Sequence, residues 1–206
     1  MDSELSTIID PNDIELIKQY VNESKQILIT THVSPDGDAL GSTLALYNFL
    51  KKKRKNVKLM VPNSFPYFLK WMPGIDEVLI FEYNPAAGKT VIENSDLIFL
   101  MDYIPKRIRE MGPYIEMSKA KKVLIDHHPN PTDKCNVTIS IPRISSTSEL
   151  IFRIFYQSGD FEDLSKIEAE CIYCGMMTDT GAFTYGSSSP EVYTIISLLL
   201  RKEIDK

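Results

Sequence analysis

All three histidines of this chain lie close to carboxylates, and each such cluster follows a short apolar run. His32 is followed by Asp36 and Asp38, and residues 126–128 read Asp-His-His. A further apolar run ends at Asp102 without a histidine. Imidazole nitrogens and carboxylate oxygens together suit a divalent metal such as manganese, iron or zinc. The pattern therefore predicts a metal-dependent hydrolase.

The elements that must position these residues alternate along the chain. Apolar runs bounded by polar residues predict strands at 27–31, 57–61, 78–81, 97–101 and 122–125. Helical spacing and capping residues predict helices at 11–21, 39–50, 65–71, from 105 with a break near 113, and at 146–156, 165–177 and 190–200. This order favours an α/β fold, with a mostly parallel sheet flanked by helices in three layers and a helical C-terminal part.

The predicted strand ends explain why the polar clusters belong together. In an open parallel sheet, ligands bind beyond the carboxyl ends of the strands. His32, Asp102 and residues 126–128 each follow a strand, so three strands deliver polar residues to one edge of the sheet. Asp179, which follows an apolar helix, would be a turn residue on its own and becomes a candidate ligand beside the other clusters.

The bulk composition is that of an ordinary globular protein. The 206 residues are 43% hydrophobic and 25% charged, with a net charge of −5 that gives no general basic field for nucleic acid or anionic membranes. Three cysteines are too few for a disulfide framework, and the acidic N-terminus lacks an apolar signal core. No apolar stretch is long enough to span a membrane, so a cytoplasmic protein is expected.

Several other features have a simpler structural explanation. The basic segment 51–55 suits the solvated C-terminal end of a helix. Cys171 and Cys174 have metal-binding spacing but no second ligand pair, which favours core packing. Residues 145–148 could hold a phosphate at a helix N-terminus or simply cap that helix, and the sequence leaves both interpretations open.

Residues 31–42 (THVSPDGDALGS) and 126–128 together closely resemble the DHH phosphoesterase superfamily. Asp102 and Asp179 fall where the family's other two aspartate motifs are expected. The first motif and segment 64–74 are most similar to the bacterial bifunctional oligoribonuclease and pAp phosphatase (nanoRNase) branch. The resemblance implies the N-terminal catalytic domain of that branch over residues 1–185, and a linker helix at 186–206 towards a missing C-terminal substrate-binding domain.

The resemblance also implies a set of site residues and a cofactor. Two divalent ions are expected, usually Mn²⁺, with Mg²⁺ or Co²⁺ as alternatives, and Asp102 would bridge them. The implied metal ligands are His32, Asp36, Asp38, Asp102, His127 and Asp179. His128 would donate a hydrogen bond or a proton to the substrate, and Asp126 would orient a metal-ligating histidine. Arg107, Ser146 and Thr147 are the candidates for binding a substrate phosphate.

The function implied by the resemblance is hydrolysis of short oligoribonucleotides and of 3′-phosphoadenosine 5′-phosphate (pAp) by a metal-activated water. A pyrophosphatase or cyclic-dinucleotide phosphodiesterase of the same superfamily is the first alternative. A non-catalytic metal- or nucleotide-binding fragment is the second. No membrane partner is expected, and a homodimer is compatible with the resemblance while the oligomeric state stays open.

Overall fold

A computed structural model describes residues 5–103, 109–131 and 134–205. Six parallel strands form one sheet in the order β3-β2-β1-β4-β5-β6. The strands are β1 (Ile27–Thr30), β2 (Val57–Val61), β3 (Leu79–Ile80), β4 (Leu97–Met101), β5 (Lys121–Asp126) and β6 (Val137–Ser140). The α/β fold with a parallel sheet, predicted from the sequence, is confirmed.

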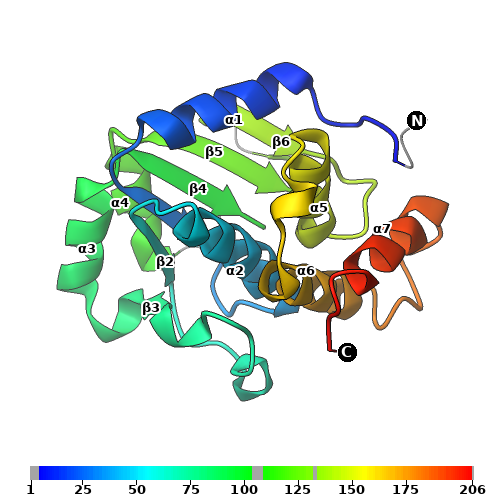
Figure 1. The fold of residues 1–206 in the computed structure, drawn as a ribbon. Helices are drawn as coiled ribbons and strands as arrows, with labels where there is room; N and C mark the ends of the chain where they lie inside the picture. Colours follow the sequence, from blue (N-terminus) through cyan, green and yellow to red (C-terminus); the bar gives the residue numbers. More distant parts are fainter. Residues whose placement is uncertain (1–4, 104–108, 132–133, 206) are drawn as a thin grey trace.

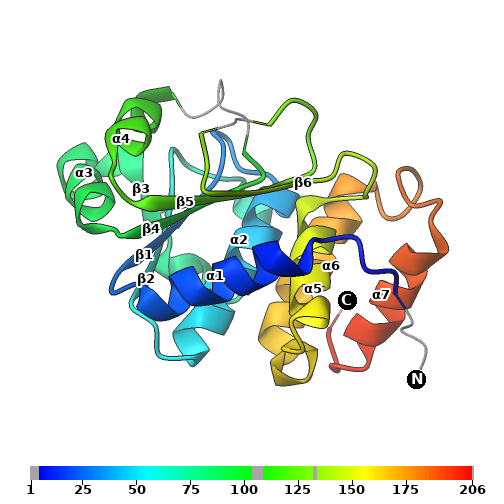
Figure 2. The same cartoon turned by 90° about the horizontal axis from the view of Figure 1, so that it is seen from above.

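Helices cover both faces of this sheet. They are α1 (Pro11–Glu23), α2 (Gly37–Lys52), α3 (Pro85–Asn94), α4 (Gly112–Met117), α5 (Thr147–Gln157), α6 (Lys166–Asp179) and α7 (Pro190–Leu200). Figure 2 shows α3 and α4 on one face and α1, α2, α5 and α6 on the other. None of the helices within the described ranges is both long and apolar enough to span a bilayer.

The two helical layers enclose two separate cores because successive strand residues point to opposite faces of the sheet. Ile29 and Phe99 belong to the larger core, which the α1, α2, α5 and α6 helices cover. Leu28 and Ile98, one position earlier in each strand, belong to the smaller core beneath α3 and α4. The two central strands are therefore buried at every position, and all of their residues except Thr30 are apolar, as expected for a parallel sheet that is covered on both faces.

The strand order creates a crevice at one edge of the sheet. From β1 the chain passes through α2 to β2 on one side, whereas β4 lies on the other side of β1. The direction of winding thus reverses between β1 and β4, and such a reversal opens a crevice beyond the carboxyl ends of the two strands. His32 follows β1 and Asp102 follows β4, so both lie at this switch point, beyond the carboxyl ends of the two strands.

Several elements differ from the sequence-based predictions. Neither α3 nor β6 was predicted, and the strand predicted at 78–81 is limited to the two residues of β3. The helix predicted from 105 begins outside the described residues. Pro113 does not break a helix there but lies in the first turn of α4, where its missing N–H is not needed. Within the predicted linker 186–206, α7 buries Val192 and Ile195 in the larger core.

Contact between α2 and α6 depends on Gly41. A Cβ at this position would lie 2.6 Å from the carbonyl oxygen of Cys171 and 2.9 Å from the Cα of Gly175. Because these are backbone atoms, Gly41→Ala would push two helices apart, and we expect it to lower the free energy of unfolding by about 1–3 kcal/mol. Urea unfolding measures the loss. Glu93→Ala, at an exposed position of α3, is the control, and equal stability of both variants would contradict this packing.

Candidate metal centre

Six histidine and aspartate side chains meet at the switch point, although they come from five separate parts of the fold. Asp36 and Asp38 lie at the start of α2, and His127 follows β5. Asp179 is the last residue of α6, and the other two follow β1 and β4. Side-chain atoms of these residues form groups of three in which all candidate ligand atoms lie within 4.8 Å of one another.

One group consists of His32, Asp36 and Asp102. The His32 Nε2 atom lies 3.3 Å from Oδ2 of Asp102 and 3.9 Å from Oδ2 of Asp36. The other ring nitrogen, Nδ1, lies 2.7 Å from the carbonyl oxygen of Val33. The carbonyl can only accept, so Nδ1 carries a proton. Nε2 donates to Asp102 in the chain without cations, and loss of that proton would present its lone pair to a metal ion.

A second group consists of Asp38, His127 and Asp179. The Nε2 atom of His127 lies 3.4 Å from Oδ2 of Asp179 and 3.8 Å from Oδ2 of Asp38. It is also 3.8 Å from Oδ1 of Asp102. One nitrogen therefore faces three carboxylates, an arrangement of donors that suits a divalent cation.

Asp102 joins the two groups, because its Oδ2 faces His32 and its Oδ1 faces His127. Burial of this carboxyl opposes ionisation, but hydrogen bonds from His128 and His32 outweigh it and hold the Asp102 pKa well below its usual range. Its backbone has φ 49°, in the left-handed region. This region is uncommon for residues other than glycine and is tolerated best by Asn and Asp, and such conformations are frequent at functional sites.

His128 is held at the edge of the cluster. Its Nδ1 lies 2.9 Å from Oδ1 of Asp126 and 3.2 Å from Oδ1 of Asp102. Hydrogen bonds raise the pKa of His128 to about 10, with Asp102 contributing most and Asp126 second, so in the chain without cations the ring carries a proton at neutral pH. Its side chain is 33% exposed. Asp126 thus contacts His128, and its predicted role in orienting a metal-ligating histidine stays a prediction.

The N-terminus of α5 carries an internal anion. Asp38 is 1% exposed, and its two carboxylate oxygens accept hydrogen bonds from the backbone N–H groups of Thr147 (2.7 Å) and Ser148 (2.8 Å). Thr147 also donates from Oγ1 to Asp102 at 3.1 Å, while Ser146 caps the helix by accepting from the N–H of Glu149. A carboxylate at a helix N-terminus is stabilised by the helix dipole.

This arrangement differs from the substrate contact that the sequence suggested for Ser146 and Thr147. Both residues are fully buried, and the N–H group that would bind a phosphate is occupied by Asp38. Of the two interpretations that the sequence left open, the structure displays the helix cap. Arg107, the third candidate for phosphate binding, lies outside the described residues.

The cluster carries more negative charge than its surroundings compensate. Burial and the nearby Asp102 carboxylate raise the pKa of Asp38 well above its ordinary value. Burial also raises the pKa of Asp179, although His127 partly opposes that shift. Four aspartates in so small a volume need positive charge to remain ionised together. The donor set of carboxylates and imidazoles therefore fits one or two divalent cations.

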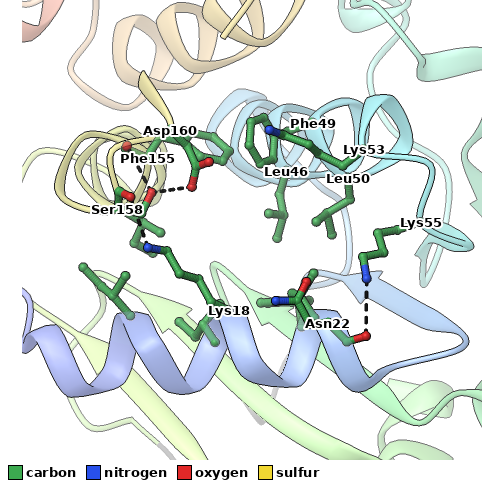
Figure 3. A pocket seen from close by; sticks show the side chains of 15 residues that line it. Lys18, Asn22, Leu46, Phe49, Leu50, Lys53, Lys55, Phe155, Ser158 and Asp160 are labelled. Carbon is green, nitrogen blue, oxygen red and sulfur yellow. Dashed lines mark hydrogen bonds between the residues drawn. The ribbon is translucent and has the colours of Figure 1, made fainter. Parts of the chain in front are cut away.

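A separate cavity of about 410 Å³ lies between α1, α2 and α5 (Figure 3). It is lined by none of the six candidate ligands, and Phe99 of β4 forms part of its wall. Each of its three lysines has a partner: Lys18 donates to the Ser158 carbonyl, Lys55 donates to the Asn22 carbonyl, and Lys53 pairs with Asp163. The cavity is therefore an apolar space within the helical layer and is distinct from the metal centre.

The fold and the site define an α/β protein with a cluster of candidate metal ligands at the switch point of a parallel sheet. A family model described as "DHH family, N-terminal domain" matches residues 26–176. The chain belongs to the DHH family. The sequence motifs predicted the DHH phosphoesterase superfamily and its nanoRNase branch. The family match and the similarity to NrnA proteins confirm this prediction.

Two curated relatives illustrate the range of this family. The bifunctional oligoribonuclease and PAP phosphatase NrnA of Thermus thermophilus is 30% identical over 179 residues, covering 84% of this chain and 49% of its own. The cyclic-di-AMP phosphodiesterase PdeA of Listeria monocytogenes is 26% identical over 184 residues, covering 85% of this chain and 28% of its own. The chain thus spans about half the length, or less, of these curated relatives.

Solved structures share the fold. An exopolyphosphatase-related protein from Bacteroides fragilis is 48% identical, with a TM-score of 0.96, and the match covers 98% of this chain and 59% of that protein. A crystal structure of exonuclease RecJ bound to manganese is 16% identical, with a TM-score of 0.55 over 92% of this chain and 46% of RecJ. At this identity the likeness to RecJ extends to the fold alone.

Proposed function

We propose that the chain is a metal-dependent phosphoesterase that hydrolyses short oligoribonucleotides and pAp. The observation that carries the proposal is the sharing of Asp102 between two groups of metal-ligating side chains, one with His32 and one with His127. Paired ions held in this way stabilise both the attacking and the leaving oxygen of a phosphoryl transfer. Sites with one ion do not need a carboxylate that faces two ligand groups.

His32, Asp36 and Asp102 would hold one ion, and Asp38, His127 and Asp179 would hold the other together with Asp102. When bound, divalent ions such as Mn²⁺ activate water near neutral pH and offset the charge of the phosphate. Asp38 is fixed by two backbone N–H groups of α5, so its orientation does not depend on the ion.

His128 would complete the site on the substrate side. Its Nδ1 is held by Asp126 and Asp102, which leaves the opposite nitrogen, Nε2, to donate to the substrate. In the chain without cations, hydrogen bonds to Asp102 and Asp126 raise the pKa of His128 to about 10, so the ring is protonated at neutral pH. It is therefore suited to give its Nε2 proton to the leaving oxygen, as a general acid.

The NrnA relatives support nucleotide substrates, since an enzyme of that name from Thermus thermophilus is 30% identical over most of this chain. PdeA, at 26% identity, favours a second candidate, the hydrolysis of cyclic-di-AMP. RecJ is bound to manganese in its crystal structure, which makes this the first ion to test.

A substrate panel tests the proposal. The 206-residue chain is assayed with pAp, a diribonucleotide, cyclic-di-AMP and pyrophosphate, each with Mn²⁺ and with a chelator. We expect Mn²⁺-dependent release of mononucleotides from the diribonucleotide and of phosphate from pAp. Turnover of cyclic-di-AMP alone would favour the second candidate. If two ions bind but nothing in the panel is hydrolysed, the phosphoesterase proposal is wrong for this chain.

A further inference from the structure

Three large aromatic side chains are exposed within residues 67–71, in the segment that follows β2. Tyr67 is 82% exposed, Phe68 67% and Trp71 55%. Single exposed aromatic residues are common, but a contiguous group on one surface marks an interaction site more often than chance allows. We call Tyr67, Phe68 and Trp71 the aromatic platform.

The aromatic platform rests on a well-anchored backbone. Leu69 and Met72, which alternate with the exposed rings, are each 1% exposed and belong to the larger core. The backbone N–H of Met72 donates to the carbonyl oxygen of Leu69 at 3.1 Å, and the N–H of Lys70 donates to that of Tyr67 at 3.0 Å. The segment is therefore held in place, and only the three rings and Lys70 point outwards. Such rings lose little conformational entropy when a ligand covers them.

The residues just before the aromatic platform contact the loop that holds two candidate metal ligands. Asn63, which lies between β2 and the platform, accepts a hydrogen bond at Oδ1 from the backbone N–H of Ser34 at 2.6 Å. Ser34 belongs to the loop between His32 and Asp36, two of the candidate ligands. In Figure 1 this teal segment extends beyond the carboxyl end of β2, the side of the sheet where the metal centre lies. The aromatic platform therefore begins four residues after a contact with the loop that carries two candidate ligands.

Lys70 adds positive charge to the aromatic platform. Its Nζ lies 4.9 Å from the centroid of the Tyr67 ring. Among the residues that the structure describes, Lys70 has no carboxylate partner within ion-pair distance. Flat π-faces beside an unpaired cation match a chain in which flat bases alternate with phosphates, as in single-stranded nucleic acids. An apolar protein surface would not need the cation, and pyrophosphate would not need the rings.

We propose that the aromatic platform stacks unpaired bases of a single-stranded oligonucleotide whose scissile phosphate lies at the metal centre. The position of the scissile phosphate at the metal centre rests on the proposed function, whereas base stacking can be measured without turnover. Base stacking on the platform favours linear oligonucleotides over pyrophosphate as the substrate class, because only oligonucleotides have bases that extend beyond the reacting phosphate.

Trp71 gives a direct test, because it is the only tryptophan of the chain. Its fluorescence is titrated with a short oligoadenylate and with an abasic oligomer of the same length and charge, both with a chelator present to prevent hydrolysis. We expect saturable quenching by the oligoadenylate and little change with the abasic oligomer. Equal responses to both, or no response to either, would overturn the stacking. A Trp71 emission that varies with protein concentration and not with the oligomer would assign the surface to self-association instead.

Substitutions separate this inference from the proposed function. Phe68→Ala and Trp71→Ala are each expected to weaken binding of a labelled oligoadenylate roughly tenfold, and to leave Mn²⁺ stoichiometry unchanged. Tyr193→Ala removes a ring that is 53% exposed on α7 and is the matched control. If the wild-type chain binds the oligomer through Trp71 but hydrolyses nothing, only the proposed function fails. If the chain hydrolyses oligonucleotides and the platform variants bind like the control, the platform inference fails.

Discussion

Asp102→Asn should lose stoichiometric binding of the second Mn²⁺ ion and reduce kcat/KM by about a thousandfold or more. Asp102 presents one oxygen to His32 and the other to His127, so its charge serves both ligand groups. Removing stabilisation of several kcal/mol from a phosphoryl transfer corresponds to a loss of this size. Isothermal titration with Mn²⁺ and steady-state kinetics measure the two effects. Asparagine is chosen because it tolerates the left-handed backbone with φ 49°.

A matched control for this variant is Asp76→Asn, which removes one exposed carboxylate that belongs to none of the ligand groups. It should bind metal and substrate like the wild-type chain. The melting temperatures of both variants, measured in chelator, establish that the fold is intact. An Asp102→Asn protein that still binds two ions with unchanged affinity would show that Asp102 does not bridge, and would remove the main support for a binuclear site.

His128→Ala should keep Mn²⁺ binding close to that of the wild-type chain and lower kcat by about 10²–10⁴-fold, the usual contribution of a positioned acid. The physical reason is that its Nδ1 is committed to Asp126 and Asp102, which leaves Nε2 to donate. In the metal-free chain the pKa of His128 is about 10, so the proton is present at neutral pH and lost as the pH rises through that value. Bound cations would lower this pKa.

The pH dependence of kcat distinguishes an acid from a structural residue. The wild-type rate should fall on the alkaline side as His128 loses its proton, and the variant should lack that fall. Asp126→Asn, which weakens one of the two hydrogen bonds to Nδ1, should move the fall to lower pH. A variant that loses metal and activity together would identify His128 as a ligand, in line with the third group that it forms with Asp102 and His127.

The central strands and their polar ends could be predicted because each signal is local. An apolar run such as 97–101 must be buried on both faces, and the residue that follows it must lie at the edge of the sheet. This reasoning identified the positions of His32, Asp102 and His127 at one crevice, which the structure brings within ligand distance. Packing of Cys171 and Cys174 in the core was also predicted, and both are buried and free.

Elements with weak local signals were missed. β6 alternates between buried and half-buried residues and is only four residues long, and α3 begins with Pro85 and contains Gly88. The sequence signal that could have predicted α3 is its N-cap residue, Asn84. Hydrogen bonds from the start of α5 to Asp38 join residues 109 and 110 positions apart, and no local pattern reports such a contact. The sequence therefore gave a phosphate and a cap equal weight there.

The spread of the ligands along the chain has a consequence for folding kinetics. His32 and Asp179 are separated by most of the chain and meet only when β1, β4 and β5 are paired and α6 is docked. Parallel pairings of this kind form slowly, because long loops must close first. A cation that binds only when all ligands are in place cannot accelerate folding. It should therefore slow unfolding, while refolding proceeds at the metal-free rate.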